Sequence, residues 1–188
     1  MQVPCLLAKD IKFEDRIFNI HDFYSLFKQE VTNKSGTIIK SGIGEIRIKE
    51  LGWFNWNLMY PNPIKIISNS KTMWFYDSLV NQVNIFFMKN VIKNTPFVFF
   101  TEKNNKFLKN YNIFKKQDCF TLFPKIDVST IKYYTICINS NSVIKKIQFV
   151  EKNNFKNVII FYKQKLQKFD KNQFVFTSIP GVTVDDQR

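Results

Sequence analysis

The side chains able to do acid–base or metal chemistry are few and widely separated in this chain. Its 188 residues include one histidine, His21, and the carboxylates are scattered, with adjacent pairs at Glu14–Asp15 and at Asp185–Asp186 near the C-terminus. One histidine without a suitable partner nearby cannot support most acid–base or metal schemes. The sequence also lacks a Gly-rich phosphate loop and the GxSxG, HExxH and CxxC motifs. We therefore predict that the protein is not an enzyme and uses no metal or cofactor.

The three cysteines, Cys5, Cys119 and Cys137, match no metal-ligand spacing. The midpoint between Cys119 and Cys137 falls in the turn-like segment 127–129, so these two residues can face each other across a hairpin. A disulfide fits there in an oxidising compartment, but the sequence alone favours two buried free thiols. Cys5 lies in residues 1–8, which we interpret as a signal-peptide remnant or a disordered N-terminus because they end in Leu-Leu-Ala.

The formal net charge of +13, with a sequence pI near 9.6, suggests nucleic acid or an anionic surface as a partner. However, the lysines are spread along the whole chain, and the arginines other than Arg188 are Arg16 and Arg47. Nucleic-acid footprints are clustered and favour arginine. We interpret the charge as solvated surface and keep a basic nucleic-acid- or anionic-surface-binding β-rich module as the alternative function.

The strongest pattern is apolar and occupies residues 53–61. Phe54, Trp56 and Leu58 alternate with asparagines, so the three apolar side chains share one face of a predicted strand. Ile46 and Ile48 alternate with charged residues in the same way. One apolar and one polar face are typical of a half-buried antiparallel sheet. The apolar face either closes on itself as a core or holds a ligand.

Two-residue periodicity continues through most of the chain after Gln29. The predicted strands are 30–40, 42–50, 53–60, 63–68, 72–76, 82–88, 110–115, 119–124, 131–139, 143–151, 155–163 and 173–177. Their spacing of about ten residues with polar turns indicates an antiparallel meander rather than alternating β and α units. The fold class predicted is α+β, mainly β.

Two segments are predicted to be helical. Between Asp10 and Gln29, apolar residues at three- and four-residue spacing predict an amphipathic N-terminal helix that Asp10 caps. Its apolar stripe consists of Phe13, Ile17, Ile20, Phe23, Tyr24 and Phe27. In segment 89–101, a threonine cap followed by Pro96 predicts a short helix that presents three phenylalanines. One turn cannot bury so much aromatic surface on itself, so the helix requires a sheet face or a ligand beneath it. From the pattern alone, a container for an apolar ligand and an ordinary α+β core remain equally open.

Six segments in order along the chain resemble the outer-membrane lipoprotein carrier (LolA) family of Gram-negative bacteria. They are residues 27–31, 54–56, 71–77, 94–97, 122–125 and 181–188. The resemblance runs from about residue 9 to the end, and it implies a single domain of residues 9–188. The family fold is an open, incomplete antiparallel β-barrel covered by a helical lid.

The resemblance also implies a function and a set of contact residues. A monomeric periplasmic chaperone of this kind takes acylated lipoproteins from an inner-membrane lipoprotein-releasing ABC transporter. It then delivers them to an outer-membrane receptor lipoprotein, and it uses neither nucleic acid nor a cofactor. The residues expected to contact acyl chains are Ile46, Ile48, Phe54, Trp56 and Leu58 on the sheet and Ile17, Phe23, Phe97 and Phe100 on the lid.

The chain departs from the family pattern at Glu50, where the family usually has an arginine that holds the lid. By strand phase, Glu50 is expected on the same face as Ile46 and Ile48, directed towards the cavity. An ionised carboxylate accepts hydrogen bonds but cannot donate them to lid carbonyl groups. We therefore expect Glu50 to occupy the lid-latch position and the lid to be held less firmly than is usual in the family.

Overall fold

The computed structural model describes residues 12–92, 95–101, 105–126 and 130–188. The predicted remnant at residues 1–8 and the predicted helix cap Asp10 lie outside the described residues. The described residues form one 12-stranded sheet. Its strands are β1 (Phe23–Thr32), β2 (Ile38–Glu50), β3 (Trp53–Tyr60), β4 (Ile64–Asn69), β5 (Thr72–Asp77), β6 (Gln82–Phe87), β7 (Tyr111–Lys116), β8 (Cys119–Pro124), β9 (Ile131–Ile138), β10 (Ile144–Glu151), β11 (Lys156–Leu166) and β12 (Thr183–Asp186).

The sheet is strongly curved and open. Its strand order is β12-β6-β5-β4-β3-β2-β1-β11-β10-β9-β8-β7, so β12 and β7 form its two edges. Every neighbouring pair is antiparallel except β12 with β6, which is parallel. The sheet therefore does not close into a barrel, in agreement with the incomplete barrel that was predicted.

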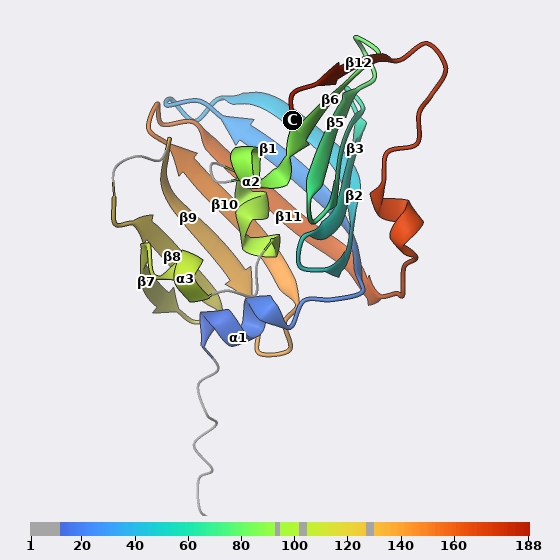
Figure 1. Cartoon of the computed structure of the whole chain (residues 1–188). Helices are drawn as coiled ribbons and strands as arrows, with labels where there is room; N and C mark the ends of the chain where they lie inside the picture. The colour runs from blue at the N-terminus through green and yellow to red at the C-terminus, as the bar shows by residue number, and fades with distance from the viewer. Residues whose placement is uncertain (1–11, 93–94, 102–104, 127–129) are drawn as a thin grey trace, which may run out of the picture.

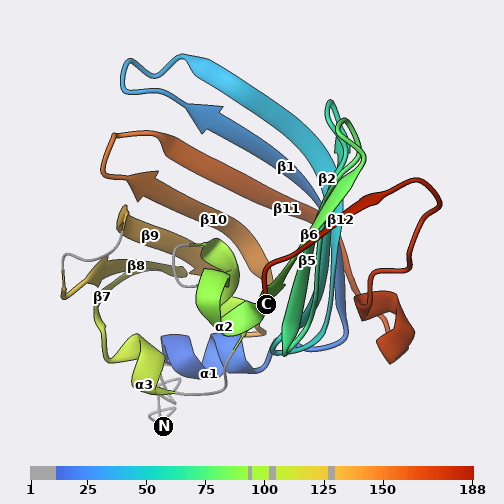
Figure 2. The same ribbon diagram turned by 45° about the horizontal axis from the view of Figure 1, so that its top comes forward.

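Short helical segments lie over the concave face of the sheet (Figures 1 and 2). They are α1 (Phe13–Phe18), α2 (Met88–Val91), the 3₁₀ helix η2 (Pro96–Phe100) and α3 (Asn105–Leu108). We refer to α1, α2 and η2 together as the cover. A further 3₁₀ helix, η3 (Lys171–Phe174), lies beyond the convex face.

The long N-terminal helix predicted over residues 10–29 is wrong beyond Phe18, because residues 23–32 form β1. Phe23, Ser25 and Phe27 are buried in alternation with their less buried neighbours, as expected of a strand. β1 also pairs with β2 on one side and β11 on the other, near the middle of the sheet. Apolar residues at this spacing fit both helix and strand, and pairing on both edges decides the outcome.

The last predicted strand, 173–177, is also wrong. Phe174 ends η3 with none of its side chain exposed, and it packs on the convex face against Trp53 at a ring-centroid distance of 6.3 Å. The chain returns to the sheet only at β12. A small convex core results, in which Phe174 joins Ile67 and Phe169.

Cys119 and Cys137 form a disulfide, which corrects the prediction of two free thiols. The two residues are directly opposite each other on β8 and β9. The predicted hairpin placement is therefore confirmed. Among the described residues, no helix has the length and apolar character needed to cross a membrane.

Candidate functional site

The concave face of the sheet supplies an apolar floor. Ile46 and Ile48 of β2 and Phe54 and Trp56 of β3 are each no more than 5% exposed. The register pairs Ile46 with Trp56 and Ile48 with Phe54, so the four side chains form two adjacent rows. Trp56 stacks on Phe27 of β1 at a centroid distance of 3.7 Å, which extends the floor to a third strand.

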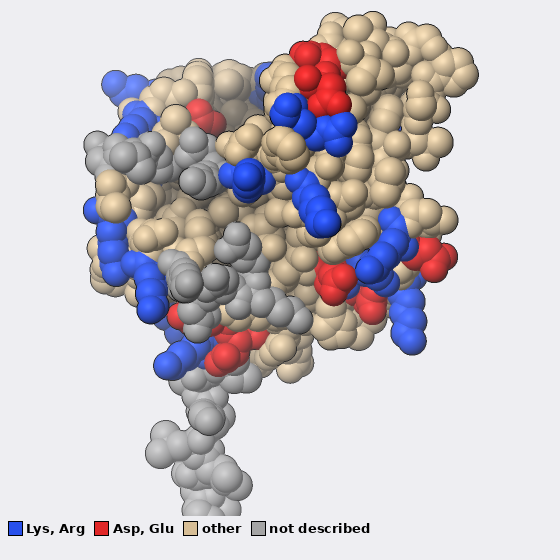
Figure 3. Space-filling view, viewed as in Figure 1, with Lys and Arg blue, Asp and Glu red and all other residues tan. Residues whose placement is uncertain are grey.

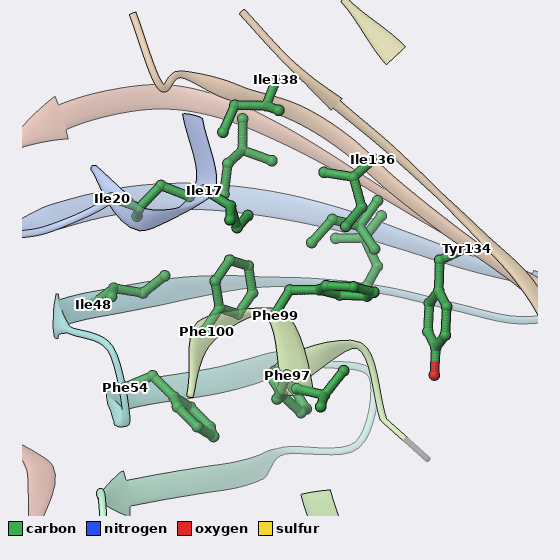
Figure 4. Packing of buried hydrophobic residues seen from close by; sticks show 14 of the residues in the cluster. Ile17, Ile20, Ile48, Phe54, Phe97, Phe99, Phe100, Tyr134, Ile136 and Ile138 are labelled. Carbon is green, nitrogen blue, oxygen red and sulfur yellow. The ribbon is translucent and has the colours of Figure 1, made fainter. Parts of the chain in front are cut away.

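The cover supplies an apolar ceiling that touches this floor. All five residues of η2 are buried. Phe97 stacks on Phe54 at 5.0 Å with an interplanar angle of 8°, and it meets Trp56 edge-on at 5.3 Å. Figure 4 shows Phe97 and Phe54 packed in this way, with Phe100 beside Ile48.

A second group of rings closes the interior on the β8–β9 side. Phe99 of η2 meets Tyr134 of β9 edge-on at 4.9 Å. Phe13 of α1 contacts Phe120 of β8 at 5.1 Å and Phe99 at 6.3 Å. The cover therefore packs on the sheet through aromatic rings together with aliphatic side chains such as Ile17, Met88 and Val98.

The site brings together all nine predicted contact residues in one apolar cluster, with Leu58 partly buried at its margin. Phe23 belongs to β1 and not to the cover, so its assignment to the lid is corrected. The prediction omitted Phe13, Phe99 and Tyr134 as contact residues. The two-residue periodicity of 131–138 signalled an inward row through Tyr134 and Ile136. No sequence signal showed that η2 would bury every one of its side chains.

A main-chain hydrogen bond ties η2 to the turn between β2 and β3. The Gly52 amide donates to the Phe100 carbonyl at 2.5 Å. The Gly52 carbonyl in turn accepts from the Ser70 amide at 2.7 Å and the Ser68 hydroxyl at 2.8 Å. Gly52 has φ +88°, and a Cβ there would lie 2.8 Å from the Ser70 Cβ, so glycine is required.

A buried arginine ties α1 to the other end of the sheet. Arg16 is 4% exposed and donates from Nη1 to the Ile138 carbonyl and to Asp118 Oδ1, each at 2.7 Å. Its guanidinium also lies over the Phe120 ring, 5.1 Å from the centroid. Because Arg16 bonds to charged and main-chain acceptors together, it fixes α1 against the turns at the ends of β8 and β9.

Glu50 does not follow the strand phase that was expected of it. The register between β2 and β3 shifts between Ile48 and Glu50, and the Glu50 side chain is exposed. The carboxylate is therefore not directed into the interior as Ile46 and Ile48 are.

The interior contains phenols that are costly to ionise. Burial raises the pKa of Tyr111 to about 12, and it raises the pKa of Tyr134 still further above its ordinary value, with Tyr111 adding to the effect. The Tyr134 hydroxyl is buried and has no hydrogen-bond partner in the described part of the chain. Among the described residues, no group of three or more His, Cys, Asp or Glu side chains could hold a metal ion, and His21 is exposed. The site is therefore suited to holding apolar matter and carries no catalytic constellation.

Two open clefts flank the sheet. One, of 440 Å³, continues the concave face beyond the cover and is lined by Val31, Ile39, Leu58 and Ile64 among others. The other, of 670 Å³, lies on the convex face and is lined by polar side chains such as Glu45, Arg47 and Asn55. The smaller cleft is the one that suits an apolar ligand, and Leu58 joins it to the interior.

The chain is similar to known proteins over almost its whole length. Residues 19–177 match the family model described as outer membrane lipoprotein carrier protein LolA. An outer-membrane lipoprotein carrier protein of Yersinia pestis bv. Antiqua is 33% identical over 175 residues, which cover 93% of this chain and 87% of that protein. The protein of the same name from Yersinia enterocolitica is 34% identical over 173 residues, or 92% of this chain and 85% of that one.

Solved structures support the fold. An uncharacterised conserved protein from Thermus thermophilus superposes with a TM-score of 0.51 at 10% identity, covering 87% of this chain and 91% of that one. The likeness in fold therefore extends to proteins with little sequence in common.

Proposed function

The chain belongs to the LolA family of outer membrane lipoprotein carrier proteins, and on this premise we propose that it shields the acyl chains of lipoproteins and carries them across the periplasm. The observation that carries the proposal is the aromatic interior, in which rings of the cover pack on rings of the sheet. A carrier family is not enzymatic, and the chain is therefore not an enzyme, as predicted.

The chemistry of the cargo explains why such an interior is useful. Each buried methylene of an acyl chain contributes about 0.8 kcal/mol, so an acylated protein does not leave a bilayer for water unaided. When the cover lifts, the contacts that Phe97 and Phe100 make with the sheet become available to hydrocarbon. In this proposal the cover is a lid. Contacts between the sheet residues and the lid residues are exchanged for contacts with acyl chains; the sheet residues are Phe23, Ile46, Ile48, Phe54, Trp56 and Leu58, and the lid residues are Ile17, Phe97 and Phe100.

The cleft beyond the cover supplies the entrance in this proposal. It is open to solvent and lined by aliphatic side chains beside polar ones such as Gln29 and Lys40, and its residue Leu58 packs against the interior. An acyl chain seated there would contact Leu58, at the margin of the interior, before the lid moves and exposes the rest of the floor. Entry at this point requires no break in the sheet.

The remaining features of the proposal concern partners and place. We propose a monomeric domain of residues 9–188 that receives cargo from an inner-membrane lipoprotein-releasing ABC transporter and passes it to an outer-membrane receptor lipoprotein. The disulfide between Cys119 and Cys137 supports an oxidising compartment such as the periplasm.

Release of a lipoprotein from membranes tests the proposal directly. Vesicles that contain the transporter and a labelled lipoprotein are incubated with ATP and the purified protein, and the soluble fraction is analysed by size. We expect the label to appear there as a one-to-one complex. Label that remains on the vesicles while the protein is folded contradicts the proposal.

Leu58→Ser is the variant that tests the contribution of the apolar site to cargo binding. Leu58 is partly buried, so its replacement leaves the core packed. Loss of one apolar contact is expected to weaken cargo binding roughly tenfold. Leu79→Ser serves as the control, since Leu79 is 65% exposed and lies outside the site. The same polypeptide without acyl chains should form no complex with any of the proteins.

A further inference from the structure

The outer face of β7, β8 and β9 carries an aromatic row that the carrier function does not use. Phe114, Phe123 and Tyr133 come from the three strands in turn, with centroid distances of 5.9 and 5.4 Å. Phe114 is 63% exposed and Phe123 is 39% exposed. We call these three residues the aromatic row. They point away from the interior, because their strand neighbours Leu122 and Tyr134 are fully buried on the opposite face.

The strand register places lysines next to the aromatic row. Lys116, Cys119, Cys137 and Lys146 are successive partners across β7, β8, β9 and β10, so two lysines flank the disulfide on this face. Phe114 lies two residues before Lys116 and shares its face. The next row on this face lies between the disulfide and the pair Phe123 and Tyr133. It is formed by Thr121 and Thr135, whose hydroxyls lie 3.3 Å apart. The disulfide and this threonine pair hold the register in which rings and cations are neighbours.

The charge of strands β7 to β10 is mainly positive. They contain five lysines (Lys115, Lys116, Lys132, Lys145 and Lys146) and one acidic residue, Glu151. The register places Lys116 and Lys146 on the outer face, whereas Lys115 lies over the ring of the buried Phe120. Glu151 accepts hydrogen bonds from Asn153 and Asn157, and the nearby Asp118 is paired with Arg16. In Figure 3, basic side chains follow the edge of the molecule at which β7 to β9 lie in Figure 1.

We propose that this outer face binds the surface of an anionic bilayer. Tyrosine favours the headgroup level of a membrane, exposed phenylalanines insert at its apolar boundary, and lysines near an anionic surface are attracted to its phosphates. The composition favours a bilayer over nucleic acid, because the cations are lysines and because Phe114, Phe123 and the following Ile126, which is 62% exposed, offer hydrocarbon to the partner. The surface lies on the opposite side of β7–β9 from the apolar interior, so bilayer binding leaves the cover free to move.

Vesicle sedimentation with the full chain tests this inference. We expect the protein to sediment with vesicles that contain phosphatidylglycerol and to remain in solution with vesicles of phosphatidylcholine alone. Added salt should weaken the binding, since the attraction of lysines to the surface is screened. Equal binding to both kinds of vesicle, or to neither, overturns the proposal.

Paired variants separate the two contributions. Phe114→Ser with Phe123→Ser should weaken binding to the anionic vesicles at least tenfold, and Lys116→Gln with Lys146→Gln should weaken it severalfold. The control is Leu79→Ser with Leu166→Ser, since these leucines are 65% and 80% exposed elsewhere on the surface. The control pair should bind as the wild type does.

Two results would overturn the inference even if vesicles bind. One is wild-type affinity in the double phenylalanine variant while its circular dichroism is native. The other is that short duplex DNA binds the protein more tightly than the vesicles do and displaces it from them, while DNA binding is weakened by the lysine substitutions and not by the phenylalanine substitutions. This result would assign the surface to nucleic acid. Lipoprotein release by the double phenylalanine variant is measured in parallel, so that failure of the carrier function is distinguished from failure of bilayer binding.

Discussion

Gly44 shows how a missing side chain positions the site. A Cβ on Gly44 would clash with the Phe27 ring and with the Asn57 carbonyl oxygen. The ring of Phe27 can therefore lie across β2 and stack on Trp56 only because position 44 carries no side chain. The floor of the interior thus depends on a residue that contributes no apolar surface of its own.

The buried phenols show a different residue-scale effect, on stability at alkaline pH. Below pH 10 a tyrosine is protonated in both the folded and the unfolded chain. Above pH 10 the unfolded phenol ionises, whereas burial keeps Tyr111 protonated up to a pKa of about 12. The unfolded state is therefore favoured progressively as pH rises from 10 towards 12.

We predict that Tyr111→Phe makes the free energy of unfolding fall less steeply between pH 10 and pH 11.5 than it does in the wild type. The slope should decrease without vanishing, because burial also raises the pKa of Tyr134. Urea unfolding at a series of pH values measures the slope. Tyr60→Phe is the control, since Tyr60 is 67% exposed. Identical slopes for wild type and Tyr111→Phe would contradict the prediction.

At the scale of elements, the cover is held at two ends by different chemistry. Gly52 donates one main-chain hydrogen bond to the end of η2, and Arg16 anchors α1 through a charge-assisted pair of hydrogen bonds. Between these points the Met88 amide of α2 donates to the Lys71 carbonyl, and the remaining contacts are mainly apolar and include several ring pairs. Few directional bonds and many exchangeable ring contacts suit an element that must open.

Glu50 is exposed and directed away from the interior, but it lies two residues before Gly52, which binds the end of η2. A longer side chain at position 50 therefore tests whether this attachment can be strengthened. An arginine there offers five N–H donors to carbonyl groups of the cover, whereas the glutamate offers none when ionised. We predict that Glu50→Arg slows amide hydrogen exchange in η2 by roughly tenfold, as expected for about 1.4 kcal/mol of added stability. Hydrogen exchange followed by mass spectrometry or NMR measures the change.

Glu30→Arg is the matched control for this experiment, because it changes the charge equally on β1, where Glu30 pairs with Lys28. The control should leave exchange in η2 as in the wild type. Equal protection of η2 in wild type and Glu50→Arg would show that position 50 does not latch the cover here.

At the scale of the whole molecule, an open sheet is combined with a closed interior. The two edge strands, β12 and β7, are not paired with each other, and the short helices cover the concave face (Figure 2). The rings of Phe54, Phe97, Phe99 and Phe100 are each at most 7% exposed. An acyl chain can therefore reach the floor only after the cover has moved away from the sheet.

This arrangement predicts a kinetic signature of binding. The observed rate of binding of a fluorescent diacylated peptide should reach a plateau as its concentration rises, because opening of the cover becomes rate-limiting. Stopped-flow measurement of the change in tryptophan fluorescence provides the rate, since Trp56 lies on the floor. A rate that increases linearly at all concentrations below the micelle threshold would show that the interior is accessible without opening.

The sequence alone determined the features that depend on local periodicity. Strands β3 and β8 have the predicted bounds, since two-residue alternation is a property of the strand itself. The absence of catalytic motifs and the apolar face that β2 and β3 bury were likewise readable from residue types. The Pro96 turn was predicted as a helix start because proline fixes φ at the first helical position.

Only the tertiary structure decided features that depend on which segments meet. Residues 23–32 became a strand because β2 and β11 pair with both of its edges, and Phe174 became part of a 3₁₀ helix because it packs on the convex face. The disulfide, the Arg16 anchor and the Gly52 bond to Phe100 join residues that are 18, 102 and 48 positions apart, respectively. Such contacts leave no periodic signal in the chain, because strand pairing brings the two cysteines together and packing of the cover on the sheet brings the other partners together.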